Sequence, residues 1–176
     1  MPDFEITQAF WQIFSPTDPV LRVRFIHPDR RAYEREGTLR LLWDDVRHFQ
    51  GHGYGVFYFL NAVRQGPGSG AGGCATDKDV TGVRVVAIDC DEGFPARYHS
   101  PPDIVVYTSP GRGQAIWHIW GCPLSQFRRI QQRLAEHYRS DPSVVNLSRV
   151  FRLPGTLNTK YPDQPVVTFS TKQSLR

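Results

Sequence analysis

The sequence has little cysteine and no long run of apolar residues, and both shortages exclude classes of protein. Its 176 residues include three cysteines, Cys74, Cys90 and Cys122, which are too widely spaced for a CxxC zinc site or a disulfide framework. No apolar stretch approaches the ~18–20 residues that cross a membrane. The opening residues, MPDFEITQAF, lack the basic start and apolar core of a signal peptide. We therefore expect a cytoplasmic protein with no membrane partner.

Lysine is also scarce, so arginine supplies most of the positive charge. Lys78, Lys160 and Lys172 are the only lysines among 21 basic residues, which face 17 acidic ones and leave a formal net charge of +4. Arginine is the better bidentate ligand for phosphate, and a basic balance favours a polyanionic partner. The alternative is that the arginine bias follows genome composition. A hydrophobic share of 40% and a charged share of 22% are ordinary for one compact domain.

The hydrophobic pattern predicts an α+β fold in which helices pack on one face of a sheet. Helices are predicted over residues 3–14 after an Asp3 cap, from a Thr38 cap to Gly51 or Gly53, and over residues 123–138. Strands are predicted over residues 21–26, 54–61, 83–90, 103–109, 114–120 and 165–169. The glycine-rich stretch over residues 65–79 predicts a loop, either a passive connection or a flap near a ligand.

Two aspartates end the strand that has the most buried character. Asp89 and Asp91 are two residues apart, so on a strand their side chains point to the same side. Two carboxylates on one side repel each other unless a cation lies between them, and Mg²⁺ and Mn²⁺ prefer carboxylate oxygens. The pair therefore predicts a divalent metal site. The alternative is a strand that simply runs out into a polar turn.

Two further segments carry residue types that bind phosphate. The turn TSPGRGQ, residues 108–114, offers a serine and backbone N–H groups beside an arginine. Residues 141–160, DPSVVNLSRVFRLPGTLNTK, place Arg149 and Arg152 among apolar neighbours and add Lys160. The alternatives are an ordinary hairpin turn and a solvated basic loop. His118 lies four residues after Gln114 on the same strand face, where it contacts a ligand or packs in the sheet.

These segments, in this order, resemble the archaeo-eukaryotic primase superfamily, above all the primase-polymerases and RepB-like primases of plasmids, phages and mobile elements. The resemblance covers residues 50–165 well and the N-terminal third in outline. It implies an α/β unit over residues 1–60 joined to a part like an RNA-recognition motif, with an antiparallel sheet and helices, over residues 80–170. The active site is expected in the cleft between them. Residues 1–176 would then be a catalytic domain, without the helical accessory region or helicase that often follows.

The resemblance also implies roles for individual residues. Three acids would bind two Mg²⁺ or Mn²⁺ ions and be catalytic: Asp89, Asp91 and Asp141. Asp141 precedes the two arginines of the third segment by eight and eleven residues, as the family's last acid often does, although some relatives have an acid where this chain has Asn146. Residues implied to bind the nucleotide are Ser109, Arg112, Gln114, His118, Arg149, Arg152 and Lys160, with Asn61 and Arg64 for sugar or phosphate contacts. Gln114 replaces a histidine of many relatives, as in RepB-like members.

The expected activity is two-metal, template-directed nucleotidyl transfer by a DNA primase or DNA polymerase in replication. Its partners would be a single-stranded DNA template and NTP or dNTP, together with an accessory domain or helicase. We expect much of the basic excess at Arg112, Arg149, Arg152 and Lys160, facing three aspartates. One alternative is a non-catalytic module that binds single-stranded nucleic acid. Another is a replication-initiator nickase, but its His-hydrophobic-His metal pair does not occur in this sequence.

Overall fold

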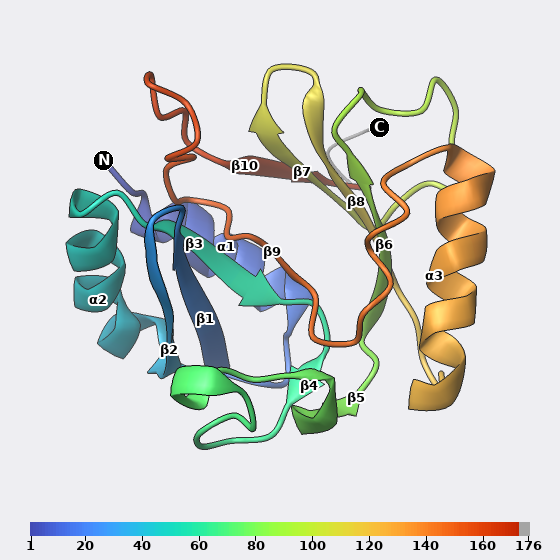
Figure 1. The fold of residues 1–176 in the computed structure, drawn as a ribbon. Helices are drawn as coiled ribbons and strands as arrows, with labels where there is room; N and C mark the ends of the chain where they lie inside the picture. The colour runs from blue at the N-terminus through green and yellow to red at the C-terminus, as the bar shows by residue number, and fades with distance from the viewer. Residues whose placement is uncertain (173–176) are drawn as a thin grey trace.

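The computed structural model describes residues 1–172, which form two four-stranded antiparallel sheets, a two-stranded ribbon and three α-helices (Figure 1). The first sheet has the order β2 (Arg30–Thr38), β1 (Val20–His27), β3 (Gly55–Phe59) and β9 (Val150–Arg152). The second sheet has the order β10 (Thr168–Thr171), β7 (Ile104–Ser109), β8 (Arg112–His118) and β6 (Val85–Cys90). The ribbon pairs β4 (Ala62–Val63) with β5 (Val80–Gly82), and the helices are α1 (Phe4–Phe14), α2 (Leu39–Gly51) and α3 (Leu124–Tyr138).

The first sheet is covered on one face by α1 and α2. Phe25 of β1 stacks on Phe49 of α2, with ring centroids 4.1 Å apart. Tyr58 of β3 meets Phe10 of α1 edge-on, with ring centroids 5.0 Å apart. Alternation along the strands directs these aromatic side chains to one face, so the opposite face of β3 and β9 is left for the polar pocket described below.

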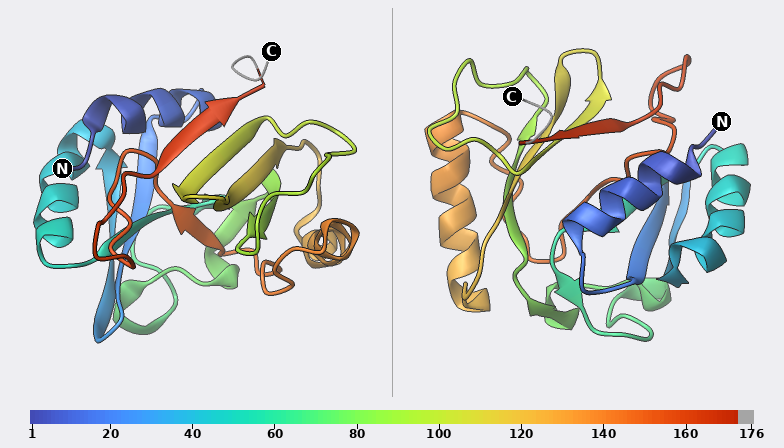
Figure 2. Two further views of the ribbon diagram at one scale, coloured as in Figure 1. Left: turned by 90° about the horizontal axis from the view of Figure 1, so that it is seen from above. Right: turned by 180° about the vertical axis from the view of Figure 1, so that it is seen from behind.

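The outer face of the second sheet is covered by α3. Gln131 of α3 is buried, and its side-chain amide accepts the N–H of Ala87 at 3.0 Å and donates to the carbonyl oxygen of Ala87 at 2.9 Å. Trp117 of β8 stacks on Tyr138 at the last turn of α3, with centroids 5.7 Å apart. These contacts fix α3 against β6. Figure 2 shows that α2 and α3 lie on opposite sides of the molecule, with the two sheets between them.

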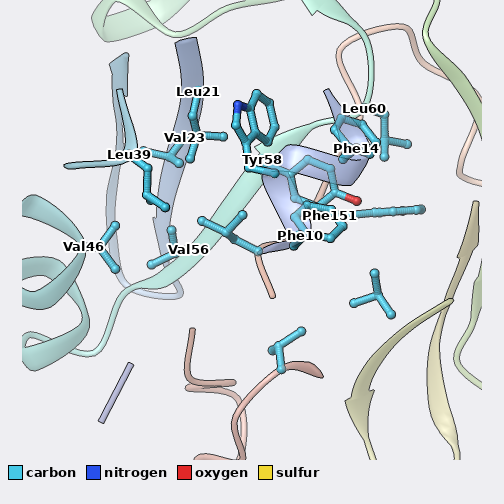
Figure 3. Close-up of a cluster of buried hydrophobic side chains, with 14 of the residues drawn as sticks. Phe10, Phe14, Leu21, Val23, Leu39, Val46, Val56, Tyr58, Leu60 and Phe151 are labelled. Atoms are coloured by element: carbon cyan, nitrogen blue, oxygen red, sulfur yellow. The ribbon is translucent and has the colours of Figure 1, made fainter. Parts of the chain in front are cut away.

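One hydrophobic core joins the two sheets (Figure 3). Phe10 of α1 and Tyr58 of β3 are fully buried there, as are Val85 of β6 and Ile104 of β7. Burying apolar surface is the main stabilising contribution in a domain of this size. Because side chains from both sheets share this cluster, the sheets form one folded body.

The predicted α+β fold is confirmed, while four strands were not expected from the sequence: β2, β9 and the two short strands of the ribbon, β4 and β5. β2 was missed because its sequence, RRAYEREGT, lacks apolar alternation and the strand lies exposed at a sheet edge. Edge strands commonly carry charge, and here Glu34 of β2 forms ion pairs with Arg22 and Arg24 of β1 at 2.8 and 2.5 Å. β9 was missed because three residues carry too little periodicity. No helix within residues 1–172 is both long and apolar enough to span a bilayer.

Candidate functional site

Asp89 and Asp91 lie between two cavities and line both of them. The first, here called the acidic cavity, has a volume of about 310 Å³ and lies between the end of β6 and the segment that follows α3; it is lined by Asp89–Gly93, Pro95 and Tyr138–Pro142. The second, here called the basic pocket, has a volume of about 220 Å³ and is lined by Phe57, Asp89, Asp91, Thr108, Arg112, Gln114, Arg149–Arg152, Asn158, Lys160 and Tyr161.

The alternation of β6 directs Asp89 away from α3. Val85 and Ala87, at the preceding positions of the same face, belong to the core that joins the sheets. Asp89 is the next residue on that face and lies opposite Gln114 of β8. The side-chain amide of Gln114 donates to Asp89 Oδ1 at 3.4 Å. The inner face of the second sheet therefore changes from apolar to polar at its edge, where the site begins.

The environment of Asp89 disfavours its negative charge. Burial, and then the charges of Asp91 and Asp141, raise the pKa of the Asp89 carboxyl to about 6, against the opposing effects of the Gln114 hydrogen bond and Arg149. A carboxylate held near other carboxylates gains stability when a positive charge joins the group. The site therefore has the electrostatic character of a cation site.

Asp141 is held next to Asp89 by the backbone. Its N–H donates to the carbonyl oxygen of Asp89 at 3.2 Å, and its carboxylate accepts the N–H and the hydroxyl of Ser143 at 2.8 and 2.6 Å. Asn146 instead donates to Ser148 at 3.4 Å and lines neither cavity. Among residues 1–172, no three or more His, Cys, Asp or Glu side chains are grouped so that they could hold a metal ion.

Two arginines reach the basic pocket from the edge strand β9 and the residue before it. Arg152 lies opposite Phe57 of β3, and its guanidinium lies over that ring, 4.8 Å from the centroid. Burial lowers the pKa of the Arg152 guanidinium, although arginine stays charged at any working pH. Arg149 donates to the backbone carbonyl of Ser143 and, at 3.2 Å, to its hydroxyl.

Three buried polar atoms on residues of the basic pocket have no hydrogen-bond partner within the described chain. They are Gln114 Oε1, Arg149 Nε and Arg152 Nη1. Buried polar atoms are almost always hydrogen-bonded, to protein or to a bound molecule. These three side chains of the basic pocket therefore carry one acceptor and two cationic donors whose hydrogen-bonding capacity is unused within the described chain.

The hairpin turn between β7 and β8 meets the C-terminal loop at Tyr161. Arg112 Nη1 donates to the Tyr161 hydroxyl at 3.3 Å, and the Ser109 hydroxyl lies 3.5 Å from the same oxygen. The hydrogen bond from Ser109, followed by Arg112, lowers the pKa of the Tyr161 phenol. Asn158 anchors this loop through the carbonyl oxygen of Thr108 at 2.8 Å. Ser109 lies beside the basic pocket, in a neighbouring cavity that shares Arg112 and Tyr161 with it.

The turn after Arg152 is anchored to the N-terminus of α1. The Thr7 hydroxyl donates to the carbonyl oxygen of Pro154 at 2.8 Å, and the Asp3 N–H donates to that of Gly155 at 2.6 Å. Gly155 has a φ of +85°, and a Cβ added there would lie 2.2 Å from Thr7 Oγ1. Only glycine fits such a left-handed, closely approached position. The contacts of Pro154 and Gly155 with the start of α1 therefore fix the end of β9, and with it the position of Arg152.

Besides Ser109, three residues that the resemblance implied for nucleotide binding line neither the acidic cavity nor the basic pocket. The His118 ring contacts the carbonyl oxygen of Phe14 at 3.1 Å, and four residues of strand place it ~13 Å from Gln114. Asn61 is buried and hydrogen-bonded to the backbone of two neighbouring segments. Arg64 forms an ion pair with Asp79 at 2.7 Å. In this structure all three hold the fold together.

Sequence reasoning missed Phe57 and Tyr161, which both line the basic pocket. The alternation of YGVFYFLN could have placed Phe57 on the face opposite Tyr58, but its pairing with Arg152 depends on a strand that was not foreseen. Tyr161 directly follows Lys160, and an aromatic residue beside a basic motif was the only signal for it.

The comparisons with known proteins agree with this geometry. Residues 91–167 match the model of the RepB DNA-primase N-terminal domain. The AEP domain of the cyanophage S-2L primase-polymerase has a similar fold, with 17% identity and a TM-score of 0.76 over 97% of this chain and 90% of that chain. The catalytic domain of primase RepB′, in complex with initiator DNA, has 16% identity and a TM-score of 0.65 over 97% and 85% of the two chains.

A longer structure of primase RepB′ gives the same result, with 17% identity and a TM-score of 0.67 over 97% of this chain and 57% of that one. Among curated proteins, none matches the sequence. The matched family model covers the second aspartate and the whole RLPGTLNTK segment, and the fold matches nearly throughout. Together these findings show that residues 91–167 resemble the RepB DNA-primase N-terminal domain, and that the fold is similar to those of a phage primase-polymerase domain and of primase RepB′.

Proposed function

We propose that this chain is the catalytic domain of a DNA primase-polymerase, which joins nucleotides along a single-stranded DNA template during replication of a plasmid, phage or mobile element. The observation that carries the proposal is the position of Asp89 and Asp91 between the acidic cavity and the basic pocket. Nucleotidyl transfer needs carboxylates between an attacking hydroxyl and a triphosphate. The initiator DNA bound to the RepB′ catalytic domain supports DNA as the template.

The acidic side chains fit divalent metal ions in their chemistry. Asp89, Asp91 and Asp141 supply oxygen donors, which Mg²⁺ and Mn²⁺ prefer, and the raised pKa of Asp89 means that added positive charge is favourable there. Asp141 also accepts two hydrogen bonds from Ser143, which orient its carboxylate. Bound ions would supply Lewis-acid activation of a 3′-hydroxyl and neutralise phosphate charge.

The basic pocket would bind the triphosphate of the incoming nucleotide. The guanidinium groups of Arg149 and Arg152 have unpaired donors there, and arginine offers a fork that matches phosphate oxygens. These groups and Lys160 would stabilise the charge that develops on the leaving pyrophosphate, and the contacts of Arg149 with Ser143 and of Arg152 with Phe57 already hold the two guanidinium groups in place. Arg112, oriented by Tyr161, would complete the pocket on the side of the hairpin.

The decisive experiment measures metal-dependent incorporation of dNTP and NTP on primed and unprimed single-stranded templates. We expect Mg²⁺ or Mn²⁺ to support extension, and Asp89→Asn to reduce it by roughly 10³-fold or more, as removal of a metal ligand does. Asp29→Asn, at the exposed turn between β1 and β2, is the matched control and should keep the full rate. Extension by Asp89→Asn at the rate of the wild type would overturn the proposal.

The second candidate is a non-catalytic module that binds single-stranded nucleic acid. It is favoured by the lack, within residues 1–172, of a ready group of three metal-binding side chains. The same assay separates the two candidates, because this module would bind the template and incorporate no nucleotide with either metal.

A further inference from the structure

The outer side of α3 carries an unbalanced positive charge. The helix and the residue after it contain four arginines, Arg128, Arg129, Arg133 and Arg139, here called the α3 arginine face, and a single acid, Glu136. All four arginines are exposed. The buried side of α3, with Phe127, Gln131 and Ala135, lies against β6, so the helical period turns Arg129 and Arg133 toward solvent.

The arginines of this face have no partners within the described chain. None of the four forms an ion pair or a side-chain hydrogen bond with another residue of 1–172. Elsewhere, Arg22 and Arg24 of β1 are paired with Glu34 of β2, and Arg64, the residue after β4, is paired with Asp79. Ion pairs therefore give Arg22, Arg24 and Arg64 a structural role, and no such pairing within the described chain accounts for the α3 arginine face.

The net charge of the protein lies mainly on this helix. Four arginines and one glutamate give α3 and its C-terminal cap a net charge of +3, against +4 for the whole chain. Apart from Arg139, which belongs to the α3 arginine face, the residues lining the two cavities balance, with four basic and four acidic side chains. The acidic residues of the site therefore offset the positive charge that was expected there. The positive charge that is not offset lies beside the site, on the α3 arginine face.

The α3 arginine face leads to the site. The helix ends at the acidic cavity, which Tyr138 and Arg139 line together with Asp91 and Asp141, and Figure 1 shows the end of α3 beside the end of β6. At the other end of the helix, Trp120 lies four residues before Leu124 and is 89% exposed. A π face at one end of a basic track is a combination that binds single-stranded nucleic acid by stacking and charge.

We propose that the α3 arginine face binds the phosphate backbone of single-stranded DNA and guides it toward the acidic cavity, with Trp120 stacking on a base. The identity of this strand as template rests on the proposed function. A nucleic acid fits better than a lipid surface, because Leu124, at 38% exposure, is the one large apolar side chain of α3 among the exposed large hydrophobics of the described chain, and membrane-binding helices need an apolar face.

The test measures binding of a fluorescently labelled oligothymidylate by anisotropy over a series of salt concentrations, without metal or nucleotide. The variant Arg129→Gln with Arg133→Gln keeps good helix formers. We expect it to bind roughly tenfold more weakly at low salt, and the slope of log K against log salt to fall by about 1.4, or about 0.7 for each lost phosphate contact. Trp120→Ala should weaken binding roughly fivefold or more and leave the slope unchanged.

The matched control is Arg30→Gln with Arg40→Gln, two exposed arginines at the start of β2 and on α2, across the molecule from α3. It removes the same charge and should keep the affinity and slope of the wild type. If both double variants lost affinity for the oligonucleotide equally, the effect would be one of net charge alone and the proposal would be wrong. Unchanged affinity in both double variants would also overturn it. Tighter binding of the wild type to anionic vesicles than to DNA would overturn it as well. Thermal unfolding checks that each variant is folded. Because no catalysis is involved, failure here and failure of Asp89→Asn to stop extension are separate results.

Discussion

The backbone N–H of Asp141 donates a hydrogen bond to the carbonyl oxygen of Asp89 at 3.2 Å. This single contact joins the segment after α3 to the end of β6, although the two residues are far apart in sequence. It brings the third acidic residue to the first without any contact between their side chains. Gln131 and Tyr138 fix the position of α3 against the second sheet. The packing of α3 therefore determines where Asp141 lies relative to Asp89.

Asp89→Asn should stabilise the metal-free protein at neutral pH. The pKa of Asp89 in the folded protein, about 6, lies above its ordinary value of ~3.9. The folded state therefore binds more protons between about pH 4 and 6, and stability falls as the pH rises through that window. We expect the variant to gain about 1–2 kcal/mol in free energy of unfolding at pH 7.5 and nothing below pH 4, measured by urea denaturation with EDTA. A variant less stable than the wild type at pH 7.5 would contradict this.

Arg152→Lys should impair nucleotide use although the charge is kept. Lysine loses the guanidinium fork and the planar contact with Phe57. We expect kcat/KM for the incoming nucleotide to fall by roughly tenfold or more, in steady-state extension assays. Arg40→Lys on α2 is the control for the same replacement at an exposed site. If kcat/KM of Arg152→Lys equalled that of the wild type, the basic pocket would not be the site that holds the triphosphate.

His118→Ala should affect stability and leave nucleotide binding intact. The imidazole contacts the Phe14 carbonyl and lies near Asp103, at the other end of the second sheet from Gln114. Loss of these contacts should lower the free energy of unfolding by about 1 kcal/mol. KM for the nucleotide should change less than about twofold. A large rise in KM without loss of stability would restore the role that the resemblance implied.

Gly155→Ala should destabilise the protein far more than Gly66→Ala. Both glycines have a φ near +85°, but a Cβ at Gly155 would meet Thr7 and the Asp3 carbonyl, whereas at Gly66 nothing lies within 4 Å. We expect about 1 kcal/mol of destabilisation at Gly66 and about 3 kcal/mol or more at Gly155, from chemical denaturation. Equal effects would show that the turn moves freely away from α1.

The sequence allowed the fold class and most of the residues around the basic pocket to be predicted. The α1 helix, its Asp3 cap and the strand that ends in Asp89 follow from local pattern, since periodicity and capping act within a few residues. Arg149 and Arg152 were found through their spacing within one segment. Such local signals do not report which strands pair across the molecule.

Expectation and structure differ where long-range pairing decides which neighbours a side chain contacts. Arg152 reaches its pocket through β9, a three-residue strand that exists because β3 offers a free edge. His118 shares a strand face with Gln114, and only the length of that strand separates it from the carboxylates. Asn61 is a residue type that can bind a sugar or phosphate, but its side-chain amide donates to the carbonyl oxygen of Leu147 and accepts the N–H of Arg84.

The core that joins the two sheets also restricts how the site can move. Phe10, Tyr58, Val85 and Ile104 belong to one buried cluster, so rotating one sheet against the other would open that cluster to water. A hinge of the kind that closes many two-domain enzymes is therefore costly here. If the proposed function holds, adjustment to a bound nucleotide would fall to surface segments beside the basic pocket, such as the hairpin at Arg112 and the loop at Tyr161.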